Sequence, residues 1–393
     1  MKLGILLSAA LGLAISTGSP LGLSISILAP VVFLRQSSRR SAYVCSAAYY
    51  LAALRDVILV SRNFFGASSG LSEGVLLWII SASLLSLPWL WAWSKSQVAA
   101  LWRSPIALLL TVVPPLGIIG WASPLAGAGL LFPAQGFVGL GLALLLPGVL
   151  TIGTAEISFG CLILLLCAHI GAPQPPRAPA TWEAVSTHFG DVGHSRADLL
   201  REYQIGRELQ KLVDRSDAQV IVFPEAVVAS WTAELFRERG KIIVLGATVP
   251  ASEVPDLSAS IAALQWSPIR QSTAAAASYK NELLIRGAAT EEFSQRVPVP
   301  LGMWKPFTNT GVPLNLNGPG TIMIAGERVA PIICYEQLIT WALLRSSLER
   351  PTVIVAVSNN VWVNGTAIPK VERTSMQSWA ALFNVPIISA SNT

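Results

Sequence analysis

Long apolar runs fill the first 171 residues of the chain. They lie at residues 3–18, 20–34, 43–61, 74–93, 105–122, 126–148 and 152–171. A helix needs about 20 apolar residues to cross a bilayer, because lipid offers no partner to an unpaired backbone group. We therefore predict a transmembrane helical bundle of about seven spans over residues 1–171, with the first two spans short. For residues 2–18 the alternative is a signal peptide, because Lys2 precedes an apolar core and small residues follow it.

The remaining residues show a different pattern, in which short apolar runs alternate with amphipathic helical stretches. A proline-rich linker at residues 172–180 separates the two parts. The pattern predicts strands at residues 218–225, 241–249, 261–266, 351–360 and 385–392, and a two-stranded hairpin at 320–336. It predicts helices at residues 230–240, 337–350 and 370–384. This alternation favours an α/β domain over residues 181–393, with strands buried on both faces.

The excess positive charge of the chain lies entirely in its apolar part. Residues 1–171 carry the whole net charge of +5, and the rest of the chain is balanced. This distribution indicates membrane topology rather than a nucleic-acid partner, because basic loops stay on the cytoplasmic side. The basic segments 35–40 and 95–103 share a side if the spans pair. We therefore expect a multi-pass protein of the inner (cytoplasmic) membrane, with an extracytoplasmic (periplasmic) α/β domain.

One cysteine stands alone in the α/β part of the sequence. Cys334 follows the buried run "APII" and precedes a predicted helix, whose N-terminal amides favour a thiolate. Cys45, Cys161 and Cys167 fall in the apolar spans, where a cysteine is usually a small packing residue. No cysteine or histidine cluster has metal-ligand spacing, so we expect no metal and no cofactor. A lone thiol at the end of a strand is a candidate nucleophile.

Two charged residues also follow apolar runs in this part. Glu225 comes after "VIVFP" and Lys280 after "AAAASY", and chemistry in α/β sheets collects where strands end. If the three residues meet, Glu225 would accept the proton of the Cys334 thiol. Lys280 would then hold the oxyanion of a tetrahedral intermediate, aided by a backbone N–H near Tyr335. Singly, each has a structural interpretation: a packed cysteine, a capping carboxylate and a solvated lysine.

Three short motifs resemble, in order and context, those of the nitrilase (carbon–nitrogen hydrolase) superfamily. They are "FPE" at 223–225, "YK" at 279–280 and "CYE" at 334–336. The attachment of such a domain to a membrane bundle resembles bacterial apolipoprotein N-acyltransferase, and residues 358–393 are similar to that family's "SN-x-x-W…Q…A…P…SNT" region. More narrowly, the chain resembles a membrane protein of plasmid conjugal transfer related to this acyltransferase. The resemblance implies an αββα sandwich for the α/β domain.

The resemblance also implies roles for single residues. It makes Cys334 the nucleophile, Glu225 the general base and Lys280 the stabiliser of the intermediate. Glu336 matches an auxiliary glutamate and Tyr335 the residue beside the nucleophile. A glutamate at this position of "CYE" begins a helix equally well for dipole reasons alone.

Three further aromatic or apolar side chains, Met303, Trp304 and Trp362, are candidates for substrate or membrane contact. The first two lie in the apolar segment 301–307, of a kind that dips into lipid. Packing in the core is the alternative for all three.

The sequence departs from the resembled pattern at two places. Alanine stands where a second site glutamate is expected after Lys280, and Glu282, Glu291 and Glu292 are the candidates to replace it. The chain also stops directly after the last predicted strand, where the resembled proteins continue. Either the gene product is shorter or the sequence is truncated at its C-terminus.

These expectations combine into two alternative functions. The first is a membrane-bound, thiol-dependent acyltransferase or amidase that forms a thioester at Cys334. Its implied partners are a phospholipid or other amphiphilic acyl donor and an amine of a protein or peptide, and it would serve conjugal transfer or envelope maturation. The second is a scaffold of the transfer apparatus that has kept the fold and lost the chemistry.

Overall fold

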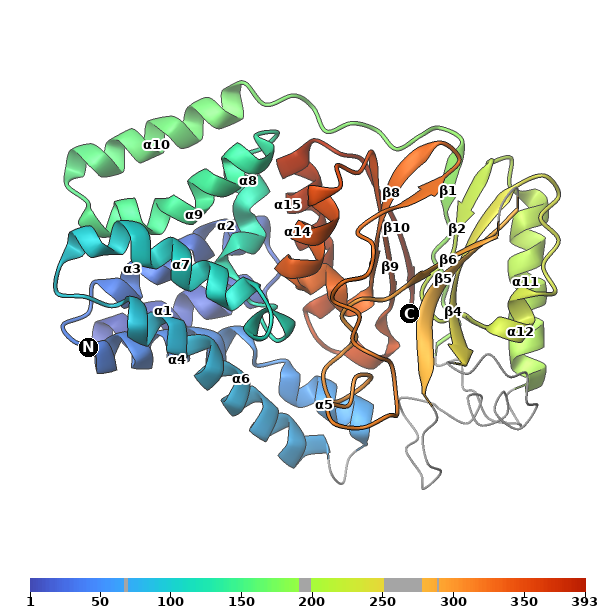
Figure 1. The fold of residues 1–393 in the computed structure, drawn as a ribbon, viewed down its shortest axis with the longest axis horizontal. Helices are drawn as coiled ribbons and strands as arrows, with labels where there is room; N and C mark the ends of the chain where they lie inside the picture. The colour runs from blue at the N-terminus through green and yellow to red at the C-terminus, as the bar shows by residue number, and fades with distance from the viewer. Residues whose placement is uncertain (67–69, 191–198, 251–277, 288–289) are drawn as a thin grey trace.

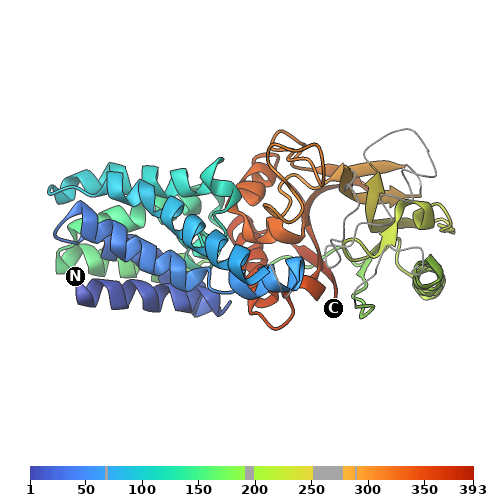
Figure 2. The same cartoon turned by 90° about the horizontal axis from the view of Figure 1, so that it is seen from below.

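The computed structural model describes residues 1–66, 70–190, 199–250, 278–287 and 290–393, and it has two parts. Figures 1 and 2 show a bundle of helices and a two-sheet sandwich side by side along the long axis. The predicted strand at 261–266 lies outside the described residues. The chain passes from the bundle to the sandwich through an extended segment that includes the proline-rich residues 172–180.

The N-terminal part is helical throughout, with short turns between the helices. Its helices are α1 (Lys2–Ser16), α2 (Pro20–Ile25), α3 (Ala29–Leu34), α4 (Arg39–Ala53), α5 (Val57–Phe65), α6 (Gly70–Ala92), α7 (Ala100–Val112), α8 (Ala128–Leu131), α9 (Gly136–Ile152) and α10 (Ala155–Ile170). In the described part of the chain, α6 alone is long and apolar enough to cross a membrane unaided. Helices α4 and α5 pass the same test together but bend by 49° between them. The count of seven spans is therefore not confirmed and stays a prediction.

The two basic segments lie at the end of the bundle that points away from the sandwich (Figure 1). The Arg35 guanidinium donates to the Leu150 carbonyl at 2.7 Å, near the end of α9. The Trp93 indole donates to the Gln36 carbonyl at 2.7 Å, which joins the end of α6 to the same turn. The helices consequently alternate in direction, and both basic turns gather at one end.

Two sheets form the C-terminal part. The first contains β1 (Trp182–Ala184), β2 (Val220–Val222), β3 (Val228–Ala229), β4 (Ile242–Pro250), β5 (Tyr279–Arg286) and β6 (Glu291–Ser294), in the order β1-β2-β4-β5-β6 with β3 beside β4. The second contains β7 (Ile322–Ile324), β8 (Glu327–Ile333), β9 (Val353–Asn359) and β10 (Ile387–Asn392), in the order β10-β9-β8-β7. Valines and isoleucines of both sheets share one buried cluster, so the sheets pack face to face.

Helices cover the outer face of each sheet and complete four layers. Helices α11 (Leu199–Arg215) and α12 (Ser230–Ala233) pack on the first sheet, and α14 (Thr340–Leu348) and α15 (Ile368–Phe383) on the second. This is the αββα sandwich that the resemblance implied. The expected helix at 230–240 is shortened to α12, whereas α15 and the hairpin of β7 with β8 lie where the pattern placed them.

Helix α15 is the contact layer between the second sheet and the bundle. The Gly129 N–H of α8 donates to the Ser378 hydroxyl at 3.1 Å, and the Thr374 hydroxyl donates to the Gly18 carbonyl at 2.7 Å. A Cβ added at Gly129 would lie 1.7 Å from the Ser378 carbonyl oxygen, so only glycine permits this approach. Bundle and sandwich residues share one apolar core across α15.

Candidate active site

Cys334 sits at the sharp turn where β8 ends. It is the first residue of a short 3₁₀ helix, Cys334–Leu338, its φ is +52°, and 1% of its surface is exposed. A positive φ is uncommon for a residue with a side chain, and such strained positions cluster at functional sites. The turn holds the thiol in the space between the two sheets, where Cys334 joins the buried inter-sheet cluster.

Glu225 meets Cys334 from the opposite sheet. It follows β2 by three residues and is 4% exposed, and its carboxyl lies close enough to the Cys334 thiol for the two groups to shift each other's pKa. The Asn281 amide donates to Oε1 of Glu225 at 2.6 Å, and the Asn359 backbone N–H donates to Oε2 at 2.9 Å. The structure therefore brings together two of the three residues that the sequence nominated.

Burial raises the pKa of both groups in this pair, the Glu225 carboxyl and the Cys334 thiol. Desolvation raises the pKa of the Glu225 carboxyl, and its hydrogen bonds with Cys334, Asn281 and Asn359 oppose that rise. Desolvation first, and then the nearby carboxylates Glu225 and Glu372, raise the pKa of the Cys334 thiol well above its ordinary value. The raised pKa of the thiol favours its neutral form, and Glu225 is placed to take the thiol proton when Cys334 reacts.

Lys280 does not join them, which corrects the expectation from the sequence. It is the second residue of β5 rather than the residue after a strand, and its Nζ lies 3.7 Å from Oε1 of Glu282. Leu283 of β5 belongs to the inter-sheet cluster and Leu284 to the outer cluster under α11. Since successive side chains alternate between faces, Asn281 points inward with Leu283, and Lys280 points outward with Leu284.

The candidate replacements for the second glutamate lie elsewhere too. Glu282 shares the outward face of Lys280, where it is buried and accepts from the Ser294 hydroxyl at 2.5 Å. Glu291 and Glu292 are exposed on β6. None of the three lies at the Cys334–Glu225 pair.

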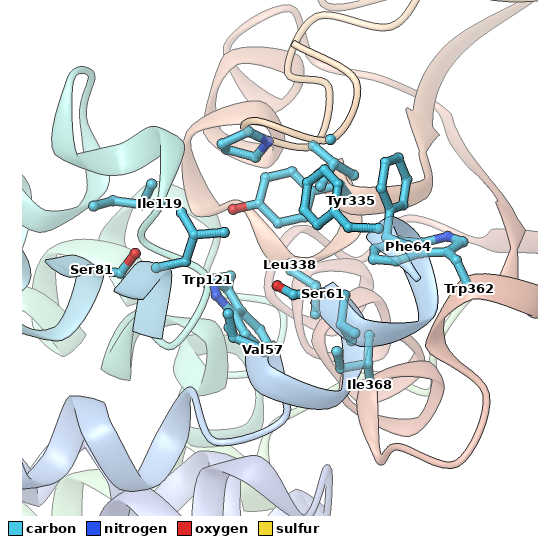
Figure 3. Close-up of a pocket in the computed structure, with 16 residues that line it drawn as sticks. Val57, Ser61, Phe64, Ser81, Ile119, Trp121, Tyr335, Leu338, Trp362 and Ile368 are labelled. Carbon is cyan, nitrogen blue, oxygen red and sulfur yellow. The ribbon is translucent and has the colours of Figure 1, made fainter. Parts of the chain in front are cut away.

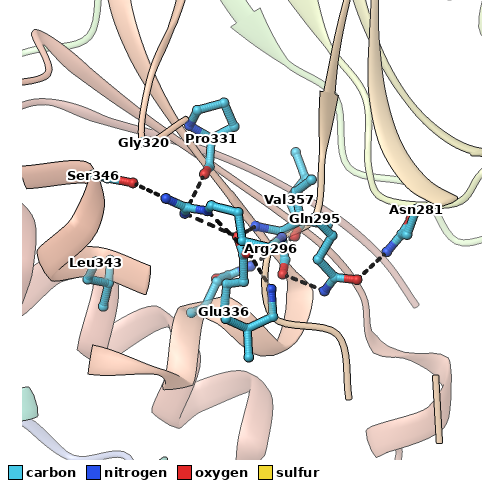
Figure 4. Close-up of polar contacts among 12 residues, drawn as sticks. Asn281, Gln295, Arg296, Gly320, Pro331, Glu336, Leu343, Ser346 and Val357 are labelled. Atoms are coloured by element: carbon cyan, nitrogen blue, oxygen red, sulfur yellow. Dashed lines mark hydrogen bonds and ion pairs between the residues drawn. The ribbon is translucent and has the colours of Figure 1, made fainter. Parts of the chain in front are cut away.

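Glu336 lies in the 3₁₀ helix that begins at Cys334, and its contacts stabilise the turn that carries the thiol (Figure 4). Its Oε1 accepts the backbone N–H groups of Arg296 at 2.6 Å and Val297 at 3.0 Å, and its Oε2 accepts that of Ile333 at 3.2 Å. The Arg296 guanidinium completes a fully buried ion pair with Oε2 at 3.3 Å. These contacts hold the backbone on either side of the site together with the Arg296 guanidinium, which is a positioning role.

The side-chain amides of Asn281 and Gln295 form a second set of hydrogen bonds that supports the Cys334–Glu225 pair. The Asn281 amide also donates to Oε1 of Gln295 at 3.0 Å, and the Gln295 amide donates to the Ile333 carbonyl at 3.1 Å (Figure 4). These bonds tie the Glu225 carboxylate to the last residue before Cys334. Sequence reasoning missed both amides, because neither Asn281, inside β5, nor Gln295, directly after β6, belongs to a recognised motif.

An apolar cavity of about 690 Å³, including its open mouth, lies where the bundle meets the site (Figure 3). Its walls come from α5, α6 and the segment 119–121 on the bundle side, and from Pro300, Gly302, Tyr335, Leu338, Trp362 and Ile368 on the sandwich side. The Tyr335 hydroxyl donates to the Ile118 carbonyl at 2.8 Å, so the residue beside the nucleophile forms part of the wall.

The expected substrate or membrane contacts are divided between this cavity and the core. Trp362 lines the cavity and lies edge-on to Phe64, with ring centroids 6.5 Å apart. Met303 is buried in a cluster with Phe64 and Tyr279, and Trp304 is half-buried. Phe307, in the same segment, is fully exposed.

The fold and the site together define an α/β sandwich with a buried thiol–carboxylate pair, docked on an apolar helical bundle. No family profile matches the chain. The chain is 29% identical to the probable conjugal transfer protein TraB of Sinorhizobium fredii (strain NBRC 101917 / NGR234), over 96% of this chain and 94% of that protein. It is also 29% identical to the conjugal transfer protein TraB of Agrobacterium fabrum (strain C58 / ATCC 33970), over 99% of this chain and 92% of that protein. The expected resemblance to a conjugal-transfer protein is thus confirmed over nearly the whole chain.

Solved structures that match the chain include an amidase from Nesterenkonia sp. AN1. A mutant form of it, described as an amidase from the nitrilase superfamily, is 11% identical over 53% of this chain and 75% of that chain, with a TM-score of 0.31. Another structure of an amidase from Nesterenkonia sp. is 10% identical over 53% of this chain and 74% of that chain, with a TM-score of 0.33.

Proposed function

We propose that this chain is a membrane-bound, thiol-dependent acyltransferase or amidase of the nitrilase type that serves conjugal plasmid transfer or envelope maturation. The observation that carries the proposal is the buried Cys334 thiol beside the buried Glu225 carboxyl, at a turn where Cys334 has a positive φ. A structural cysteine needs neither a buried base nor a left-handed backbone. The similarity to conjugal transfer proteins supports the biological setting.

The pair supplies the two proton transfers that acyl transfer requires. Sγ of Cys334 attacks the carbonyl carbon while Glu225 takes the thiol proton, and the carbonyl electron pair moves onto oxygen. When the tetrahedral intermediate collapses, Glu225 returns that proton to the leaving group and a thioester remains on Cys334. An amine or a water then attacks the thioester, with Glu225 as the base again.

The apolar cavity favours an amphiphilic acyl donor. It adjoins the nucleophile turn through Tyr335, and its other wall consists of bundle helices that we propose lie in the membrane. A phospholipid acyl chain has the chemistry to fill such a space, and an amine on a protein or peptide is the corresponding acceptor. The basic turns at the far end of the bundle support an extracytoplasmic position for the sandwich, by the positive-inside rule.

The test is acyl transfer to Cys334 in the purified full chain. A fluorescent acyl-phosphonate probe should modify Cys334, Glu225→Gln should suppress the modification, and Cys334→Ser should abolish it. Because Cys161 is half-buried and Cys167 is exposed, the assay uses a chain with both changed to serine. Modification of Cys334 that is no faster than that of an unactivated thiol, and unchanged by Glu225→Gln, would refute the proposal.

The outward position of Lys280 favours a second candidate, a nitrilase-fold scaffold without chemistry. A scaffold needs the sandwich and the bundle but no base at the thiol. The two candidates differ in a mating assay with Cys334→Ala at normal expression. Loss of plasmid transfer supports the enzyme, and unchanged transfer supports the scaffold.

A further inference from the structure

Glu372 is a buried carboxyl that neither the motifs nor the reaction above use. It lies in the second turn of α15 and is 2% exposed. Its helix packs on the turn that carries Cys334, where Ile368 and Val371 share an apolar cluster with Tyr335 and Leu338. The carboxyl therefore comes from the helix layer between the sandwich and the bundle.

The surroundings of Glu372 favour its neutral form. Its Oε1 is buried and has no hydrogen-bond partner among the described residues. Desolvation, and then the charge of Glu225, raise the pKa of the Glu372 carboxyl well above its ordinary value. Leaving a charged carboxylate buried without a partner is costly, whereas a protonated acid has one O–H to donate.

Within the part of the chain that the structure describes, no salt bridge joins Glu372 to a cation. Two titratable groups interact electrostatically with Glu372. Glu225 comes from the first sheet, and Cys334 lies on the turn after β8. Glu336 on the packed 3₁₀ helix is held by Arg296, and Lys370 and Arg373 of α15 itself are exposed. In the bundle, Asp56 accepts the backbone N–H of Ala367 at 3.1 Å.

We propose that Glu372, in its neutral form, donates a hydrogen bond to the acyl oxygen when Cys334 attacks. The inference rests on the function proposed above. That reaction needs a donor for the oxyanion, and the cationic candidate, Lys280, points to the other face of its sheet. A carboxylic acid kept neutral by an apolar site fills this role elsewhere in enzymology.

The step keeps every proton accounted for. Glu225 removes the thiol proton, and the negative charge moves onto the acyl oxygen. Glu372 shares its own proton with that oxygen without giving it up, and it keeps the proton when the carbonyl re-forms. Removal of one oxyanion donor typically lowers the rate about 100-fold to 1,000-fold.

Two substitutions of Glu372, both similar to glutamate in size, distinguish a hydrogen-bond donor from other roles of this side chain. Glu372→Gln keeps a neutral donor in the same place, and Glu372→Met keeps the volume without a donor. The assay uses the full chain in detergent with p-nitrophenyl octanoate, and intact mass measures the rate at which the acyl group appears on Cys334. We expect Glu372→Gln to acylate near the wild-type rate and Glu372→Met to acylate about 100-fold more slowly. Thermal unfolding of both variants confirms that they are folded.

The pH profile gives a readout that a purely structural residue would not move. The wild-type rate should fall as the pH rises through the raised pKa of Glu372, and this limb should be absent from Glu372→Gln. Equal rates for Glu372→Gln and Glu372→Met, or a folded Glu372→Gln that is as slow as Cys334→Ser, would overturn the inference. Failure of the wild-type chain to acylate at Cys334 at all would instead overturn the proposed function.

Discussion

Glu336 provides a strict test of the site, because the resemblance matched it to an auxiliary glutamate, whereas its contacts in the structure support the surrounding backbone. We consider Glu336→Gln, which changes the side chain by one atom. The glutamine oxygen can still accept the backbone N–H groups of Arg296 and Val297. Its amide N–H₂ then faces the Ile333 N–H and the Arg296 guanidinium, which are donors as well.

The expected loss in the free energy of unfolding follows from the burial of the Arg296 and Glu336 side chains. The side chains of Arg296 and Glu336 are 2% and 0% exposed, so the guanidinium left behind has no access to water. Breaking a buried pair from one side costs about 3–5 kcal/mol. One orphaned backbone N–H, at Ile333, adds about 1–3 kcal/mol. The total of about 4–8 kcal/mol is comparable to the whole stability of an ordinary domain, about 5–15 kcal/mol.

Denaturant unfolding of the purified chain in mild detergent, followed by tryptophan fluorescence, measures this loss. The double variant Glu336→Gln with Arg296→Met removes the buried charge and should recover about 3–5 kcal/mol of it. Glu208→Gln, at an exposed position of α11, is the matched control and should lie within about 0.5 kcal/mol of wild type. A stable Glu336→Gln with a slowed acylation rate would show that the residue is catalytic and refute the assignment.

Four further outcomes follow from the structure. Lys280→Ala should leave acylation of the nucleophile close to the wild-type rate. Asn281→Ala should move the acid limb of the pH–rate profile to higher pH, because Glu225 loses a donor to its charged form. Tyr335→Phe should lower the free energy of unfolding by about 1–2 kcal/mol, since it removes a buried hydrogen bond to the bundle. For Glu372→Gln, thermal unfolding should match wild type below pH 4.5 and occur at a higher temperature above it, because only the unfolded wild-type chain releases that proton there; equal melting temperatures at all pH values would contradict the raised pKa.

Hydrophobic periodicity was sufficient for most of the second sheet. The hairpin over 320–336 and the strand and helix patterns after it correspond to β7 to β10, α14 and α15. Each of these segments has one dominant period and a clear break at either end, so local pattern and tertiary structure agree. The meeting of Cys334 and Glu225 was anticipated from the resemblance of their motifs, because the spacing of the two residues alone does not show that the ends of their strands lie together.

The sequence pattern did not predict which residues of β5 point toward the site. Its residues 283, 284 and 285 are all apolar, because one face packs on the second sheet and the other on α11. A strand buried on both sides has no alternation, so nothing local decides whether residue 280 or residue 281 points inward.

Glu372, in contrast, could have been noticed in the sequence. It falls on the apolar face of α15, opposite the exposed Lys370 and Arg373, and an acidic residue on a buried helical face needs a reason.

The bundle does more than anchor the sandwich, because it also fixes the segment that supports Glu225. The Asn63 amide of α5 donates to the carbonyls of Trp362 and Asn364 at 3.2 and 3.1 Å. Those residues closely follow Asn359, whose backbone N–H is bonded to Glu225. Helix α5 is the short second half of a bent pair and also forms a wall of the apolar cavity. Helix α5 therefore both lines the cavity and holds the segment that follows Asn359, the residue whose backbone N–H is bonded to Glu225.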